Sequence, residues 1–173
     1  LSVTVNGAYT PEQLIALKTA YANDKISLSN KAQALTVENT GTNVDDLVDA
    51  LDGTGYKGNV TVTGATPIAI ADLQNLNNLT TGKITLNAAS LAAPYSGTAA
   101  QLVEAFAGIT GLKGNITVAT GVPTIAQLKA LNKSIDGTIT VTAATTLEGS
   151  AKDLIEALKG VTLSTGSEVK VNG

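Results

Sequence analysis

Four aspartates on one predicted helix form the densest group of side chains that could bind a metal ion. The carboxylate oxygens that calcium prefers would come from Asp45, Asp46, Asp49 and Asp52. Their spacing lacks the D-x-[DN]-x-[DN]-G pattern of a calcium-binding loop. Other predicted helices carry acidic or amide side chains at corresponding positions: Gln101, Glu104, Asp153 and Glu156. A solvated helix face therefore explains the aspartates, with a calcium site as the alternative, and we expect no other metal or cofactor.

Side chains that commonly catalyse reactions are scarce. The sequence contains no histidine and no cysteine, and all 11 basic residues are lysines. Nucleophiles activated by histidine, thiolate or imidazole zinc sites and disulfides are therefore excluded. The carboxylate pairs Asp45/Asp49 and Asp153/Glu156 lie on predicted helix surfaces, and only 3% of the residues are aromatic, too few for a glycosidase cleft. We expect that the protein is not an enzyme.

Hydroxyl side chains recur in short segments that read apolar, small polar, apolar. If the apolar residues face a core, the middle residues form a row on the exposed face of a sheet, and residues two positions later form a second row. The first row comprises Thr4, Ser27, Thr61, Thr85, Thr117 and Thr140, ending at Lys170, and the second includes Thr63, Asn87 and Thr142. This array suggests a binding face for a glycan or for ice. Thr is also a favoured strand residue on a solvated face, so both interpretations stay open.

These segments expose an internal repeat. They occupy residues 3–5, 26–28, 60–62, 84–86, 116–118, 139–141 and 169–171, and the connections between them alternate between short and long. Three super-repeats of 52–57 residues follow, at 3–59, 60–115 and 116–167, with a terminal strand at 168–173. Periods of this size indicate a stacked repeat architecture.

Every connection contains the signature of one helix. A leucine recurs in all six of them: Leu14, Leu47, Leu73, Leu102, Leu128 and Leu154. Four residues earlier stands an N-cap residue in five of the six connections, the exception being Ala69. Three of these caps pair Thr with Gln three residues later, which predicts a reciprocal capping box, and Pro11 fits the first helical position.

Glycines mark the ends of the long connections. Gly53, Gly108 and Gly160 are candidate helix C-caps. The pairs Gly58-Asn59 and Gly114-Asn115 precede strands and suggest turns with a positive φ. The segments 34–37, 91–95 and 145–147 look extended, and we interpret each as a loop or a short edge segment.

Strand, helix, strand connections of this length require parallel strands joined by right-handed crossovers. The alternating strand pattern leaves one face of the sheet in solvent. The sequence therefore predicts an α/β fold, a right-handed β-α solenoid with seven short parallel strands in sequence order and six helices on one face. We expect a single domain over residues 1–173.

The charge and hydropathy patterns limit the partners. The formal net charge is −3 and the pI is about 4.8, and neither a lysine cluster nor a row of aromatics is present. We therefore expect no nucleic-acid partner. The longest uncharged stretch, residues 84–103, is interrupted by polar residues, proline and glycine, so we expect no membrane span.

Segments 97–108, 114–118 and 124–141 resemble repeats of very large secreted or cell-surface proteins of bacteria, notably cyanobacteria. The resemblance implies an extracellular or cell-surface protein of adhesin, surface-layer or matrix type, with cell-surface polysaccharide as a possible partner. The architecture is similar to that of leucine-rich repeats, although the consensus L-x-x-L-x-L-x-x-N is absent.

The two ends of the chain are near copies of each other. Residues 1–7 and 168–173 both contain an apolar, polar, apolar strand followed by Asn-Gly. Unpaired sheet edges are templates for another strand. We therefore predict that Val169 and Val171 pair near Val3 and Val5 of another copy, or of an adjacent repeat in a longer chain, so that the module acts as a stiff spacer or filament subunit.

Overall fold

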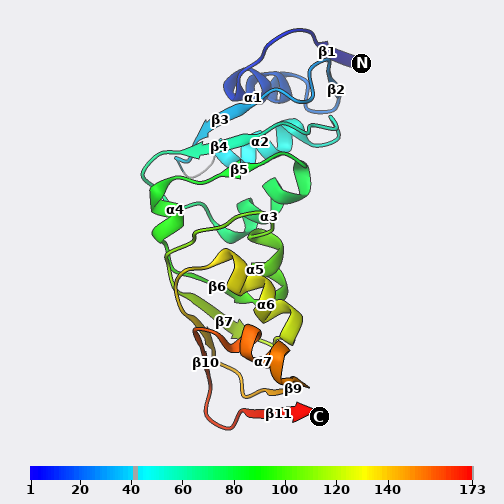
Figure 1. Ribbon diagram of the computed structural model, residues 1–173. Coiled ribbons are helices and arrows are strands. Elements are labelled where there is room, and N and C mark those ends of the chain that lie inside the picture. The colour runs from blue at the N-terminus through cyan, green and yellow to red at the C-terminus, as the bar shows by residue number, and fades with distance from the viewer. Residues whose placement is uncertain (41–42, 173) are drawn as a thin grey trace. The chain divides into compact units, whose positions relative to one another are not determined.

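The computed structural model describes residues 1–40 and 43–172 (Figure 1). The described residues form seven helices and eleven strands, all in parallel pairs, and they divide into two compact units, Leu1–Ser90 and Leu91–Gly173. The last residue of the predicted terminal strand, Gly173, lies outside the described residues. The prediction of a single domain over residues 1–173 stays a prediction.

The first unit begins with β1 (Ser2–Val5), α1 (Pro11–Ala20) and β2 (Lys25–Leu28). It continues with β3 (Leu35–Glu38), α2 (Asn43–Leu51), β4 (Val60–Thr63), α3 (Ile70–Leu79) and β5 (Ile84–Thr85). Strand β1 pairs with β2, and β3, β4 and β5 form a second sheet in that order. The helices α1, α2 and α3 pack against one another in sequence order.

The short helix α4 (Ala88–Ala92) crosses the boundary between the two units. The second unit then contains β6 (Tyr95–Thr98), α5 (Ala99–Ala105), β7 (Ile116–Thr120), α6 (Ile125–Ser134), β8 (Ile139–Val141), β9 (Thr146–Ser150), α7 (Ala151–Leu158), β10 (Val161–Leu163) and β11 (Glu168–Asn172). Its sheets have the orders β10-β8-β7-β6 and β11-β9. Helix α6 packs between α5 and α7.

All seven predicted strand segments are strands, but the predicted count and order are wrong. The described residues contain four further strands, β3, β6, β9 and β10, and the first three lie at sheet edges. Strands β3 and β9 occupy segments that looked extended, whereas only Tyr95 of the segment 91–95 belongs to β6. Strand β4 therefore pairs with β3 and not with β2, and β8 pairs with β10 and not with β11. The reason lies in the long connections, which carry a second strand of their own: Leu35 and Val37 are buried while Thr36 is exposed.

The helices follow the sequence signals closely. All six repeat leucines are buried, and Thr10, Thr98 and Thr124 each form the predicted capping box with the glutamine three residues later. The seventh helix, α4, was not predicted because it is only five residues long. Its start is stabilised by Asn87, whose side-chain oxygen accepts a hydrogen bond from the Ser90 N–H at 2.8 Å.

The glycines have two different roles. Gly53, Gly108 and Gly160 have the predicted positive φ, between 67° and 72°. The prediction of positive φ at Gly58 and Gly114 is wrong, because these glycines are needed for close backbone approach: a Cβ on Gly114 would lie 1.8 Å from the Ala93 carbonyl oxygen. In the next turn, a Cβ on Gly137 would lie 2.4 Å from the Gly114 oxygen. The backbone at Ala93, Gly114 and Gly137 is therefore in close contact, with no room for a side chain between the segments.

The asparagines after Gly58 and Gly114 connect neighbouring turns of the chain. The side-chain oxygen of Asn59 accepts a hydrogen bond from the Lys83 N–H at 2.8 Å. In the second unit, that of Asn115 accepts one from the Thr138 N–H at 3.2 Å. These partners are 24 and 23 residues apart, so each asparagine ties one repeat to the next.

Candidate functional site

A row of hydroxyl side chains crosses the four-stranded sheet of the second unit. The strand register places Ser96 beside Thr117, Thr117 beside Thr140, and Thr140 beside Thr162. Thr117 is half-buried and the other three are exposed. The first unit has two shorter rows of hydroxyl side chains. Thr36, Thr61 and Thr85 lie side by side in one, and Thr4 lies beside Ser27 in the other.

The structure therefore forms part of the predicted first row, but some of its residues have different neighbours from those predicted. The structure does not bring Ser27 beside Thr61 or Thr140 beside Lys170, because β3 and β10 take those places. The predicted row omitted three hydroxyl residues, Thr36, Ser96 and Thr162. A signal was available, since Leu35-Thr36-Val37 and Val161-Thr162-Leu163 repeat the pattern of the predicted strands.

The second predicted row forms internal hydrogen bonds. The Thr63 hydroxyl donates to the Val37 carbonyl at 3.3 Å, and the Thr142 hydroxyl donates to the Val118 carbonyl at 3.1 Å. The side-chain amide of Asn87 donates to three backbone carbonyls, the shortest distance being 2.9 Å to Gly64. These groups fix the loops after the strands, so the first row offers the freer hydroxyls.

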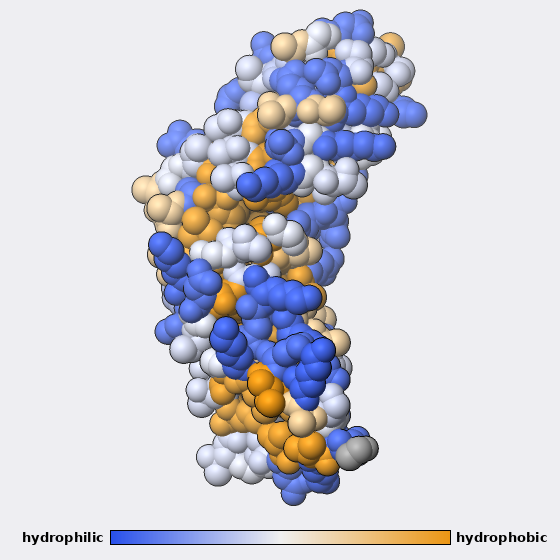
Figure 2. Space-filling view, viewed as in Figure 1, coloured by the Kyte–Doolittle hydropathy of each residue, from blue (hydrophilic) through white to orange (hydrophobic). Residues whose placement is uncertain are grey.

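The residues predicted for end-to-end contact lie on edge strands. Val3 and Val5 are half-buried on β1, whereas Val169 and Val171 on β11 are 44% and 63% exposed. Ile155 on α7 is also 74% exposed. Figure 2 shows hydrophobic surface gathered over these last elements of the second unit. The C-terminal edge is therefore the apolar one.

Three of the predicted aspartates lie on α2, and Asp52 follows its last residue. Asp45, Asp46, Asp49 and Asp52 are all exposed, and among residues 1–40 and 43–172 no group of three or more acidic side chains could hold a metal ion. Asp45 instead shares a hydrogen bond with Asp72 of α3. Burial, and then this hydrogen bond and the charge of Asp45, raise the pKa of Asp72 to about 6. The helix dipole favours a charged carboxylate at this position, but burial beside a second carboxyl outweighs it.

The raised pKa of Asp72 predicts a pH-dependent stability. The folded protein holds a proton that the unfolded chain releases near pH 4, so this stabilisation is complete below pH 4 and is lost as the pH rises through about 6. Asp72→Asn is expected to be more stable than the wild type at pH 7 by about 1 kcal/mol or less, since solvent screens a half-exposed carboxyl. Urea denaturation at pH 4, 5, 6 and 7 measures this difference.

The matched control is Asp46→Asn, which removes one exposed charge from the same helix as Asp45. The difference between Asp72→Asn and the wild type should shrink toward zero near pH 4. A difference of constant size from pH 4 to pH 7 would show that the two carboxyls do not share a proton.

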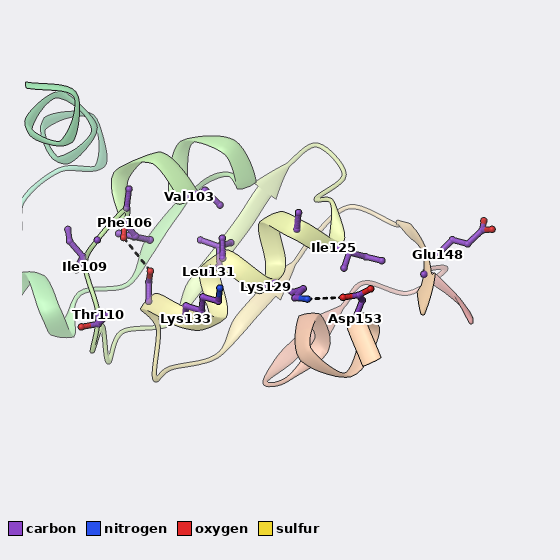
Figure 3. A pocket seen from close by; sticks show the side chains of 16 residues that line it. Val103, Phe106, Ile109, Thr110, Ile125, Lys129, Leu131, Lys133, Glu148 and Asp153 are labelled. Carbon is purple, nitrogen blue, oxygen red and sulfur yellow. Dashed lines mark hydrogen bonds and ion pairs between the residues drawn. The ribbon is translucent and has the colours of Figure 1, made fainter. Parts of the chain in front are cut away.

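Two grooves lie between helices, one in each unit. A groove of about 880 Å³ lies along α5, α6 and the start of α7 (Figure 3). A groove of about 610 Å³ lies between α2 and α3. They occupy equivalent places in the repeat, because Val48 and Val103 directly follow repeat leucines and both grooves reach the C-cap glycine. The sequence does not predict these grooves, since a groove depends on how far apart neighbouring helices pack.

No helix within the described part of the chain is long and apolar enough to cross a membrane. Comparison with known proteins provides no family for this chain: no family model, no curated protein and no solved structure matches it.

Proposed function

We propose that this chain is a structural repeat module of an extracellular or cell-surface protein of adhesin, surface-layer or matrix type, and that it associates end to end. In this proposal the parallel coils form a right-handed solenoid, and the module acts as a stiff spacer or filament subunit. The observation that carries the proposal is the open edge of β11. Among the described strands it pairs only with β9, and it exposes Val169 and Val171.

The partner edge is that of β1. Among the described strands, β1 pairs only with β2, so its other edge has free backbone donors and acceptors. Both strands belong to parallel pairs, and Val3 and Val5 have the same spacing as Val169 and Val171. Pairing β11 of one copy with β1 of the next would continue the parallel hydrogen bonding and cover the exposed valines. The partner is a second copy or an adjacent repeat of a longer chain.

The test is the association state of an edge variant. Val169→Lys/Val171→Lys places two charges on the exposed edge, where lysine blocks strand pairing. We expect that the wild-type chain forms larger species as its concentration rises and that this variant stays monomeric by sedimentation. The control is Thr140→Lys/Thr162→Lys, which places equal charge on the exposed sheet face. A strictly monomeric wild-type chain at millimolar concentration would contradict end-to-end association.

The row of hydroxyl side chains in the second unit favours a second candidate function, a binding face for a glycan or for ice. Its support is the unbroken register of Ser96, Thr117, Thr140 and Thr162 across four paired strands, about 4.8 Å apart from strand to strand. The same control variant separates the two functions. If Thr140→Lys/Thr162→Lys abolishes retention on a polysaccharide or thermal hysteresis that the wild type shows, the sheet face is the binding surface.

A further inference from the structure

The groove of the second unit has an apolar floor and apolar walls. Phe106, Ile109 and Leu131 are almost completely buried beneath it, and Val103 and Ile125 stand half-buried on its walls (Figure 3). Its volume of about 880 Å³ lies within the range of small-molecule sites, which is roughly 300–1,000 Å³. An apolar chain could therefore be covered along much of its length.

The charges that line this groove are separated along it. Lys129 lies 2.8 Å from an Asp153 oxygen and 2.7 Å from a Glu156 oxygen, so its charge is already balanced. Asp153 of α7 and Glu148 of β9 both line the end of the groove that is far from Thr110, and Glu148 points away from Asp153 (Figure 3). Lys133, in the last turn of α6, is exposed and forms no ion pair with any described residue. Lys133 therefore offers one unbalanced cation close to Leu131 and the apolar wall of the groove (Figure 3).

The equivalent groove of the first unit has the opposite character. Where the second unit has Ala130 and Lys133, the first has Asn75 and Asn78, and Asp49 and Asp52 also line it. None of its lining residues is a lysine. The groove of the first unit should therefore repel an anion, and its walls are less apolar than those of the groove in the second unit.

We propose that the groove of the second unit binds a single-chain anionic amphiphile, namely an alkyl carboxylate of the fatty-acid class. The alkyl chain lies against the half-buried Val103 and Ile125, and the carboxylate accepts hydrogen bonds from the Lys133 ammonium. Binding buries apolar surface that the fold leaves in water, and the position of Lys133 selects a negative head group. This ligand site is independent of the end-to-end association.

Calorimetric titration of the full chain with decanoate, kept below its micelle concentration, tests the proposal. We expect saturable binding at one site, with affinity rising up to about fourfold for each methylene from octanoate to decanoate. Decyltrimethylammonium should bind far more weakly, because its head group is repelled by Lys133. The methyl NMR signals of Val103 and Ile125 should shift on binding, while those of Val48 in the other groove should not.

Two variants locate the head group and the chain. Lys133→Gln is expected to weaken decanoate about fivefold, whereas Lys159→Gln, an exposed lysine of the same unit, should leave it unchanged. Ala126→Trp fills the groove from an exposed position and should abolish binding; its circular dichroism shows whether the fold is kept. The proposal is overturned if decanoate does not saturate, if Lys133→Gln binds it like the wild type, or if the ammonium amphiphile binds equally tightly.

Discussion

Gly114→Ala is expected to destabilise the second unit by more than about 4 kcal/mol, a large part of the roughly 5–15 kcal/mol by which folded domains are ordinarily stable. The new Cβ would lie 1.8 Å from the Ala93 carbonyl oxygen and 2.9 Å from that of Ala92. Both atoms belong to the backbone, so no side-chain rotation relieves the clash. The turn at Gly114 would have to move away from Ala93, and the Lys113 and Gly114 N–H groups would lose their hydrogen bonds to the Leu91 carbonyl.

The control for this prediction is Gly108→Ala. Gly108 has a φ of 72°, and a Cβ there would meet nothing within 4 Å. Its replacement costs about 1–2 kcal/mol through backbone strain alone. Urea denaturation followed by circular dichroism compares the two variants. If Gly114→Ala costs no more than Gly108→Ala, close backbone stacking does not explain the glycine.

Leu128→Ala is expected to lower the free energy of unfolding by about 3 kcal/mol. Leu128 is fully buried on α6, the helix that packs between α5 and α7. Alanine would leave a cavity there, and α6 cannot move toward one neighbouring helix to fill it without moving away from the other. The measurement is the urea midpoint at unchanged slope, which reports a stability change without a change in the surface exposed on unfolding.

Ile155→Ala provides the matched control, because Ile155 is 74% exposed on α7. It is expected to change the stability by less than about 0.5 kcal/mol in the monomer. Equal losses for Leu128→Ala and Ile155→Ala would contradict the assignment of the repeat leucines to the core.

The sequence predicted local structure well because each signal acts over a few residues. A capping box joins Thr10 to Gln13, three positions apart, and the spacing of apolar residues in a strand sets which of them face the core. Strands β3 and β10 follow the same alternation, whereas β6, with the sequence Tyr-Ser-Gly-Thr, does not. The segments at β3 and β6 were interpreted as loops or short edge segments, and β10 was not predicted, because the predicted fold placed strands only between the helical connections.

The candidate sites were harder to predict, because they depend on residues that are distant in the chain. Asp72 occupies the helical position where Gln127 forms a capping box in α6, but Ala69 offers it no hydroxyl, and its partner is Asp45 on another helix. The groove at Lys133 likewise needs α5, α6 and α7 to be placed before its walls exist.

The sequence by itself determined the repeat, the helix starts, the six buried leucines and the apolar faces of the strands. These follow from hydrogen bonds and periodicities within about four residues. Only the tertiary structure decided which strands pair, why Gly58 and Gly114 must be glycine, and which hydroxyls stand side by side. Those outcomes depend on contacts between residues 21 to 28 positions apart, such as Asn30 with Tyr9 and Ser134 with Phe106, because the space beside one segment decides which residues of a distant segment fit there.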